Sequence, residues 1–360
     1  MTMLKLLRQT TSSNIMLHNC LLAMVIIGFI LPALTLALTA NPIVGDLTRL
    51  GYLPEEEFGW HKPQVRYEKS HFSKIFPKRQ YDIIVLGDSF SLDEKRSWVN
   101  TLVSQTGLSV GVSHHRNLNL FDLGNADEIG NPRLIIFETA ERRLLDRTQL
   151  CEQPLVVHNS AAHIAGISIK QVLKSPATTI EYRPVKVDFL NIPLGYYVKK
   201  MFSPYLDPNL QERVQLVTLK SNYFSNSRSK ELLYYSADNK KKQWPATAPQ
   251  EIQCGVATMR RFSADVLKAN FLLMVMPDKS SIYGNYAVRK GISSSRLEGL
   301  FDESDVLYVD LYAELKRLVQ QGTVDVYLPN DTHISGRTQK HVGNLVVKYL
   351  MWNGVLTNFE

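Results

Sequence analysis

The sequence predicts an α/β fold in which helices cover both faces of a central parallel sheet. Apolar runs rich in β-branched residues recur along the chain, and each is too short for a globular helix. The runs are apolar throughout, as strands buried on both faces are. Helical patterns lie between and after them, an alternation typical of three-layer α/β sandwiches. The predicted strands are YDIIVLG (81–87), RLIIFET (133–139), NFLLMVMP (270–277) and VLYVDL (306–311).

Three helices are recognisable by their ends. The first two stop at Gly107 and Gly322, because glycine readily closes a helix. The third starts at Ser335, a good capping residue, and repeats apolar side chains at helical spacing. A further strand-like stretch, 324–328, comes shortly before it. The predicted helices cover 95–107, 311–322 and 335–352, which places one α/β domain over 81–360.

Residues from about 150 to 250 break this rhythm, because prolines, tyrosines and a polar run (SADNKKKQWPATAPQ, 236–250) replace the alternation. We expect an insertion that lies over one face of the sheet. Lys240, Lys241 and Lys242 are expected in a solvated loop.

The N-terminal part predicts a membrane anchor. Residues 16–38 (MLHNCLLAMVIIGFILPALTLAL) are apolar and long enough to cross a bilayer core of about 30 Å. Lys5 and Arg8 precede them and no basic cluster follows, so the positive-inside rule predicts a cytoplasmic N-terminus (1–15) and a single-pass inner-membrane protein with its domain on the periplasmic side. A cleaved signal peptide is the first alternative, weakened by Leu38 where cleavage requires a small residue. A buried core helix is the second. Residues 39–80 are expected to be a linker packed on the domain.

Composition and cysteine usage narrow the prediction of function only slightly. The 44% hydrophobic and 21% charged residues indicate a folded protein, and the net charge of +7 gives a mild preference for anionic surfaces or polymers but no reason to expect nucleic acid. Cys20 lies in the predicted anchor. Cys151 and Cys254 could pair in an oxidising compartment, and two unrelated buried thiols remain the alternative.

The histidines do not predict a metal site. Zinc-type Cys/His spacing is absent from the sequence, and no cofactor is expected. We expect His114, His115, His158 and His163 at the surface or in loops.

A candidate nucleophile, Ser89, follows the first predicted strand in VLGDSFS. Open α/β sheets bind ligands at the carboxyl ends of their strands. Gly87 permits a tight turn, and the backbone N–H groups of Ser89 and Phe90 could stabilise an oxyanion. Ser91 has the weaker claim, because Ser89 directly follows Gly-Asp.

A candidate base lies far downstream, in NDTHIS. Asp331 can receive one imidazole N–H of His333 and leave the other nitrogen for Ser89. Either motif alone has a structural alternative, because Gly-Asp-Ser is a common turn and Asp-Thr-His can cap a helix. Their combination, one after the first strand and one before the last helix, favours a catalytic triad.

These motifs resemble the first and last blocks of the SGNH (GDSL-like) hydrolase superfamily. Four further blocks are similar to the SGNH-like domain of the alginate O-acetylation proteins. The resemblance implies a flavodoxin-like three-layer fold over most of 81–351, apart from the insertion, and acyl-serine chemistry. The blocks are FETAERRLLD (137–146), MVMPDKSSIYGNY (274–286), VDLYAEL (309–315) and DVYLPNDTHIS (325–335).

The chain also departs from that family's pattern. The family's Asp-x-His block precedes its serine, whereas here the serine comes first, and Ile334 replaces the usual Trp. The Gly-Asn-Asp block that supplies the oxyanion asparagine is absent, with ETAER in its place. The oxyanion donors therefore stay open.

Three further side chains have both a functional and a structural interpretation. The Arg142 guanidinium could stabilise the oxyanion or clamp a substrate acid, or it could be a surface or Glu-paired arginine. Lys279 and Tyr283 follow a strand end and could reach the cleft or simply pack.

Residues and resemblance together predict a membrane-anchored, extracytoplasmic O-acyltransferase. It would move an acyl group, most simply acetyl, onto a hydroxyl of a cell-surface or exported polysaccharide. The resemblance favours transfer, with a membrane acyltransferase partner supplying the acyl group. An esterase using the same serine and a non-catalytic polysaccharide-binding module are the alternatives.

Overall fold

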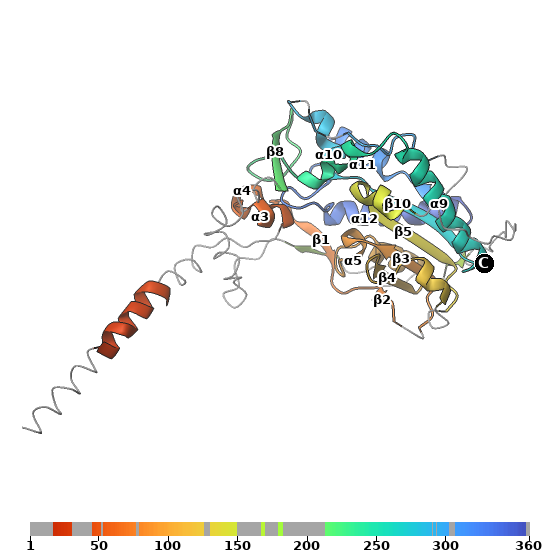
Figure 1. Cartoon of the computed structure of the whole chain (residues 1–360), viewed down its shortest axis with the longest axis horizontal. Coiled ribbons are helices and arrows are strands. Elements are labelled where there is room, and N and C mark those ends of the chain that lie inside the picture. The colour runs from red at the N-terminus through yellow and green to blue at the C-terminus, as the bar shows by residue number, and fades with distance from the viewer. Residues whose placement is uncertain are drawn as a thin grey trace, which may run out of the picture.

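A six-stranded parallel sheet forms the centre of the protein (Figure 1). In spatial order its strands are β11 (Leu307–Val309), β10 (Asn270–Met276), β5 (Leu134–Ala140), β3 (Ile83–Gly87), β4 (Val110–His114) and β2 (Ser73–Lys74). All neighbouring pairs run parallel. The computed structural model describes residues 17–30, 45–51, 53–76, 79–125, 130–149, 167–169, 179–182, 213–289, 291–292, 294–301 and 307–357.

The strand order creates a crevice at the middle of the sheet. Without the edge strand β2, the order is the 2-1-3-4-5 of flavodoxin-like sheets. The chain places β4 on one side of β3 and β5 on the other, so the order reverses between β3 and β5. Open α/β sheets bind ligands at such a switch point, outside the carboxyl ends of the strands.

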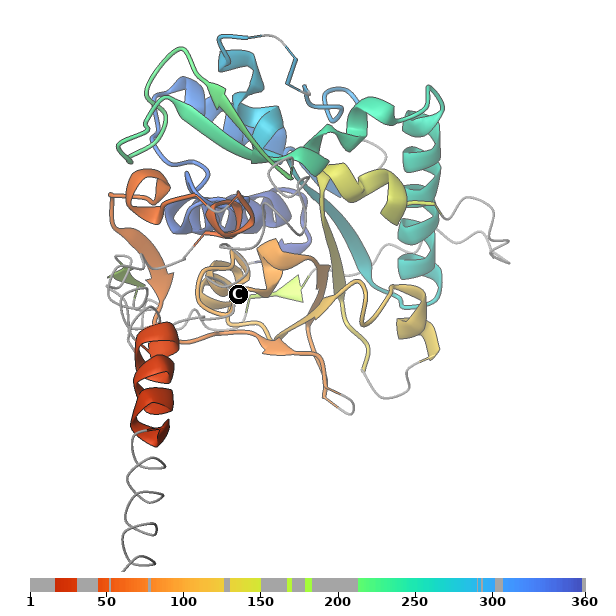
Figure 2. The same ribbon diagram turned by 60° about the vertical axis from the view of Figure 1, so that its left-hand side comes forward.

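Helices cover both faces of this sheet, which explains why every residue of β3 and β5 is buried. Helix α6 (Val99–Thr106) packs against α12 (Gly336–Trp352), and α9 (Ala248–Asp265) packs on β10. Figures 1 and 2 show α12 and α9 on opposite sides of the sheet. The predicted α/β architecture with a central parallel sheet is confirmed.

Two predicted helix ends, at Gly107 and Ser335, coincide with observed caps, whereas α6 begins at Val99, four residues after its predicted start. Gly107 adopts a left-handed conformation (φ 64°) and closes α6 with an N–H···O bond of 2.8 Å to Val103. The Ser335 hydroxyl accepts from the Thr338 N–H at the start of α12. Helix α11 (Leu311–Gln320) ends two residues before the predicted boundary.

Two local predictions were wrong or incomplete. Strand β4 was not predicted, because Gly111 interrupts its apolar pattern; a Cβ at this glycine would lie 2.9 Å from the Tyr81 ring. Residues 324–328 form a turn with one isolated bridge, Tyr327 to Ile334, instead of a strand. The positive φ of Asp325 (58°) turns the backbone out of the extended conformation.

Within the predicted insertion, the described residues 213–243 lie at the carboxyl edge of the sheet, against η3 (Glu141–Arg143) and α10 (Lys279–Tyr283), which follow β5 and β10. Strands β8 (Val214–Thr218) and β9 (Glu231–Tyr235) form an antiparallel hairpin, followed by the 3-10 helix η6 (Ser236–Gln243). Helix α9 begins at Ala248, before the expected end of the insertion at 250, and belongs to the layer that covers the sheet.

Before the predicted domain, the structure describes residues 17–30, 45–51, 53–76 and 79–80. Residues 17–30 are helical, ending in the π-helical η1 (Ile26–Ile30), with exposed apolar side chains, and lie apart from the body in Figure 1. None of the described helices has the length and apolar character to span a membrane, and the predicted span 16–38 continues outside the described residues. Helices α3 (Asp46–Gly51) and α4 (Glu55–Phe58) and strand β1 (Gln64–Tyr67) pack on the domain.

Short pairings and further helices complete the described chain. Strand β1 pairs antiparallel with β7 (Thr179–Tyr182), and β12 (Leu356–Thr357) pairs parallel with β6 (Ile167–Ser168). Cys254 is disulfide-bonded and Cys20 is free, while Cys151 lies outside the described residues, so its pairing stays a prediction. The remaining helical elements are α5 (Ser89–Leu92), η2 (Phe121–Asn125), η3 (Glu141–Arg143), α7 (Leu144–Arg147), α10 (Lys279–Tyr283) and η7 (Gly284–Tyr286).

The contact between α6 and α12 yields a stability prediction. A Cβ at Gly343 would lie 2.4 Å from Thr101 Cβ and 2.7 Å from Trp98 O. Gly343→Ala should therefore lower the free energy of unfolding by about 1–3 kcal/mol, although alanine is the better helix former. Urea denaturation measures this. Lys348→Ala, at an exposed position of the same helix, is the control, and equal stability of the two variants would contradict the packing.

Candidate active site

The turn after β3 presents Ser89 at the switch point. Ser89 is exposed at the start of α5, while Phe90 is buried. The carboxylate of Asp88 caps this helix by accepting from Phe90 N (3.1 Å), and its other oxygen accepts from Ala140 N (2.9 Å) at the end of β5. Asp88 thus ties the nucleophile turn to the neighbouring strand, and the turn holds Ser89 toward solvent.

His333 and Asp331 complete a triad with Ser89. His333 Nε2 lies 2.7 Å from Ser89 Oγ, and His333 Nδ1 lies 2.6 Å from Asp331 Oδ1. The same Asp331 oxygen accepts from the His333 backbone N–H at 3.0 Å. The structure therefore brings together the three residues expected to form the triad, in the nucleophile–base–carboxylate order that nucleophilic catalysis requires.

The electrostatics of the triad favour a charged pair. Burial opposes the charge of Asp331, but His333 and its hydrogen bonds hold the pKa of that carboxyl well below its usual range. Burial likewise opposes the charge of His333, but Asp331 raises the pKa of the imidazole above its ordinary value. The site thus stabilises the imidazolium that forms when His333 takes a proton.

The two backbone N–H groups expected to stabilise the oxyanion, those of Phe90 and Ser89, differ in whether they already have an acceptor. The Phe90 N–H donates to Asp88, so this expected donor is already occupied, and the prediction is corrected. The Phe90 ring instead packs 4.8 Å from the imidazole of His333. The Ser89 N–H, in the first turn of α5, donates to no acceptor in the described part of the chain.

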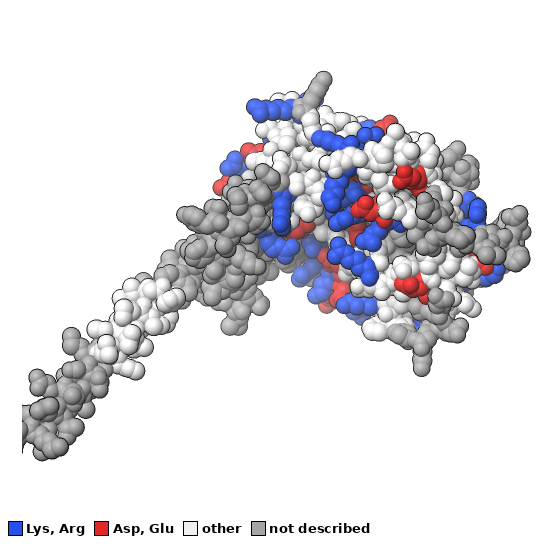
Figure 3. All heavy atoms as spheres, viewed as in Figure 1, with Lys and Arg blue, Asp and Glu red and all other residues white. Residues whose placement is uncertain are grey.

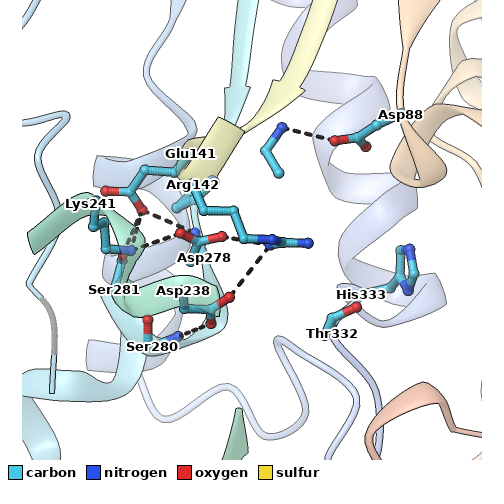
Figure 4. Close-up of polar contacts among 12 residues, drawn as sticks. Asp88, Glu141, Arg142, Asp238, Lys241, Asp278, Ser280, Ser281, Thr332 and His333 are labelled. Carbon is cyan, nitrogen blue, oxygen red and sulfur yellow. Dashed lines mark hydrogen bonds and ion pairs between the residues drawn. The ribbon is translucent and has the colours of Figure 1, made fainter. Parts of the chain in front are cut away.

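Arg142 is held by buried acids beside the site. Its Nη1 lies 2.6 Å from Asp278 Oδ1 and 3.5 Å from Asp238 Oδ1. Burial opposes its charge, yet these two carboxylates raise the pKa of Arg142. Figure 4 shows its guanidinium pointing from this cluster toward Asp88 and His333. Arg142 is therefore a paired arginine whose partners are aspartates, and it adds a fixed cation at the edge of the site.

Lys241 corrects the expected solvated loop. Its side chain is fully buried, with Nζ 3.1 Å from Glu141 Oε2 and 2.8 Å from Asp278 Oδ2. Lys240 and Lys242 are exposed, as expected. Burial opposes the charge of Lys241, yet Asp278 and Glu141 raise the pKa of its ammonium. Helix η6 turns this one lysine inward, onto acids that follow β5 and β10 (Figure 4).

Lys279 and Tyr283 lie behind the His333 loop instead of in the open site. Lys279 Nζ donates to the carbonyls of Leu328 (2.7 Å), Pro329 (2.9 Å) and Asp331 (3.1 Å). Burial lowers the pKa of Lys279 to about 7. The Tyr283 hydroxyl accepts from Tyr327 N at 3.3 Å. Both side chains are buried, so the packing interpretation describes their placement.

Sequence reasoning missed Glu138, which lies beneath the nucleophile turn. Its Oε2 accepts from Asp88 N (3.0 Å) and from Ser91 Oγ (2.8 Å). Burial and the nearby Asp88 charge raise the pKa of Glu138 well above its ordinary value. Ser91 is thus a buried structural residue, and an acid inside the apolar run IIFET was the signal that could have identified Glu138.

His115 lies in the turn after β4, within the expected surface-or-loop setting, but its side chain is buried. Its Nε2 makes a hydrogen bond with the Glu138 carbonyl, and its ring packs 4.5 Å from Phe137. Burial lowers the pKa of His115 to about 4, so the ring is neutral at pH 7. His114, next along the chain, is only partly buried. His158 and His163 lie outside the described residues.

Asp46, also missed, brings a second carboxylate to His333. Ligand atoms of Asp46, Asp331 and His333 lie within 4.8 Å of one another, close enough to hold a metal ion. Nδ1 of His333 is already engaged by Asp331, so an ion there would replace the triad's own hydrogen bond. We therefore assign Asp331 and His333 to the triad and not to a metal centre.

Comparison of the whole chain with known proteins adds no family assignment. The chain matches no protein-family model, no curated protein and no solved structure. The function proposed below therefore depends on the geometry of the triad and on the motif resemblance.

The Lys241 cluster predicts a large cost for losing its cation. Lys241→Ala leaves the carboxylates of Glu141 and Asp278 buried without it, which should lower the free energy of unfolding by about 3–5 kcal/mol. Lys240→Ala, on the exposed neighbour, should change it by less than about 0.5 kcal/mol. Thermal unfolding monitored by circular dichroism compares the two. Similar losses would mean that Lys241 is solvated.

Glu138 predicts a pH-dependent difference in stability. Because the fold raises its pKa, the stabilisation by the neutral carboxyl is complete below the ordinary value of 4.5 and is lost as the pH rises toward the folded-state value. Glu138→Gln stays neutral, so its free energy of unfolding relative to wild type should increase as the pH rises above 4.5.

Glu138→Ala serves as the comparison, because it removes the acceptor and leaves a cavity. It should cost about 2–4 kcal/mol at every pH. Urea denaturation between pH 4 and pH 8 measures both variants. A constant offset between Glu138→Gln and wild type would show that Glu138 is not protonated in the folded protein.

Proposed function

We propose that the protein is an SGNH-type serine O-acyltransferase that acts, outside the cytoplasm, on a carbohydrate hydroxyl of an exported or cell-surface polysaccharide. The observation that carries the proposal is the 2.7 Å contact between Ser89 Oγ and His333 Nε2, with Asp331 on the other ring nitrogen. The position of Ser89 at the switch point of a flavodoxin-like sheet supports it. The resemblance of VLGDSFS and NDTHIS to the SGNH blocks adds the acyl chemistry.

The mechanism has two halves that use the same base. His333 takes the proton of Ser89 as Oγ attacks the acyl carbonyl, and the Ser89 N–H, which has no acceptor in the described part of the chain, can donate to the oxyanion. The tetrahedral intermediate expels the leaving group, which receives the proton from His333, and an acyl-serine remains. His333 then takes a proton from the acceptor hydroxyl, which attacks the ester and releases Ser89 protonated again.

Arg142 supplies positive charge near the reacting centre. Its guanidinium is fixed by Asp278 and Asp238 and points toward Asp88 and His333. A cation so placed can orient an anionic part of donor or acceptor. On the face drawn in Figure 3, Lys and Arg side chains gather among scattered acids, which agrees with the mild anionic preference expected from the net charge of +7.

The membrane completes the proposed setting. The predicted anchor, 16–38, would hold the domain on the periplasmic side of the inner membrane, where a membrane-bound acyltransferase could supply the acyl group. Hydrolysis is the competing reaction, because Ser89 is exposed and water can reach its acyl ester. A non-catalytic polysaccharide-binding module is the remaining alternative, favoured by the absence of the usual oxyanion asparagine.

Ser89→Ala tests the proposal directly. The variant should lose at least about 10³-fold in kcat/KM on 4-nitrophenyl acetate, because the acyl-enzyme cannot form. Its melting temperature should match wild type, since Ser89 is exposed. Ser221→Ala, at an exposed serine of the β8–β9 hairpin, is the control and should keep full activity.

The products separate the alternatives. For a transferase, adding an oligosaccharide acceptor should place acetyl on sugar hydroxyls, detected by mass spectrometry. Release of acetate alone would indicate an esterase. Unchanged turnover by Ser89→Ala, or no turnover by wild type, would overturn the serine mechanism.

A further inference from the structure

Asp46 reaches the triad from the segment that precedes the domain. Its Oδ1 accepts from Thr332 N at 2.8 Å, and its Oδ2 accepts from the Thr332 hydroxyl. The same Oδ2 lies 3.9 Å from His333 Nδ1. The backbone N–H of Asp46 donates to Asp331 Oδ2 at 3.4 Å. Two aspartates, from opposite ends of the sequence, therefore face the same imidazole nitrogen.

A network of hydrogen bonds fixes Asp46 in this position. The N–H groups of Leu47 and Thr48 donate to the Asn330 carbonyl at 3.1 and 3.3 Å. The Asn330 amide donates to Glu55 Oε2 (2.6 Å), and Gly45 N donates to Glu55 Oε1 (2.6 Å). The start of α3 and the His333 loop are thus held as one unit.

Gly45 shows how closely these two segments approach. A Cβ at this position would lie 2.1 Å from the carbonyl oxygen of Asn330, so only glycine fits. The contact places Asp46 directly over Thr332, the residue between the two loop members of the triad. Asp46 is therefore part of a built arrangement and not an incidental surface acid.

We propose that Asp46 is a positioning residue of the active site, which holds the Thr332–His333 backbone and favours the imidazolium formed when His333 takes the proton of Ser89. This rests on the proposed serine mechanism. Together with Asp331, it gives the Nδ1 side of the imidazolium two carboxylates. The segment that would follow the membrane anchor is, on this account, a component of the catalytic site.

The sign of the electrostatic effect follows from the groups that face these residues. His333 faces three carboxylates, those of Asp331, Asp46 and, on the nucleophile turn, Asp88. Two basic side chains also face these aspartates: Lys279 interacts with Asp331 and Asp46, and Arg96 interacts with Asp331. Burial and the Asp331 charge raise the pKa of Asp46 to about 6, so it is ionised above that pH. Ionised Asp46 raises the pKa of His333, and removing its charge lowers it.

The experiment compares Asp46→Asn with wild type in the full chain. Asparagine keeps an oxygen acceptor for Thr332 but removes the charge. Because a general base must be neutral, the acid limb of the kcat/KM–pH profile on 4-nitrophenyl acetate should move to lower pH by about one unit. The plateau should fall roughly 3- to 10-fold, because a less basic imidazole takes the proton less readily. Glu56→Gln, which removes an exposed charge from the same segment, should leave both unchanged.

A second readout does not need turnover. The pKa of His333, followed by NMR of its imidazole, should fall by about one unit in Asp46→Asn. The proposal would be overturned if neither the acid limb of the kcat/KM–pH profile nor the pKa of His333 changed in Asp46→Asn. This holds even if activity fell, because Asp46 would then only support the loop. If wild type shows no turnover, or Ser89→Ala retains it, the serine mechanism fails, and the NMR titration still decides the effect of Asp46 on His333.

Discussion

The double hydrogen bond of the Asp88 carboxylate is the constraint on which the candidate site depends. It joins Phe90 N, at the second residue of α5, to Ala140 N, at the end of β5, and so closes the point where the strand order reverses. Glu138 holds the Asp88 backbone from below, through a carboxyl whose pKa is raised by burial and by the Asp88 charge. With the turn fixed from both sides, Ser89 Oγ lies 2.7 Å from His333 Nε2. Short, rigid supports of this kind are what a reactive constellation requires, because small displacements are costly to catalysis.

Buried basic side chains also hold the loops at the carboxyl edge of the sheet. Lys279 binds three carbonyls of the loop that carries Asp331, while Lys241 and Arg142 neutralise acids that follow β5 and β10. Such groups contribute little net stability relative to apolar side chains, but removing one partner is costly. Their arrangement fixes the loops at the carboxyl edge of the sheet, and it places the Arg142 cation beside the triad. With the predicted anchor ending at residue 38, eight residues of chain could place Asp46 at most about 29 Å from the bilayer.

The sequence allowed prediction of four central strands and of the motif residues that the structure brings together at the candidate site, because the strands and the two motifs are each short-range patterns. Continuous apolar runs indicated β3, β5, β10 and β11. The two-residue spacing of Asp331 and His333 predicted the hydrogen bond between their side chains. The features that the sequence did not predict arise from contacts between segments that are far apart in the chain. Asp46 accepts a hydrogen bond from Thr332, which lies 286 residues later in the chain. Lys241 is turned inward by a 3-10 helix within a polar run. The Phe90 N–H donates to Asp88. No periodicity distinguishes Lys241 from its exposed neighbours. Glu138 was visible as an acid in an apolar run, but its partners were not.

Active-site labelling tests most directly whether this arrangement makes Ser89 a nucleophile. The full-length protein would be incubated with a fluorophosphonate, which reacts with activated serines, and the labelled peptide identified by mass spectrometry. The account predicts a single adduct on Ser89, which is lost when His333 is replaced by alanine. No adduct, or an adduct elsewhere that is unaffected by the loss of His333, would contradict it.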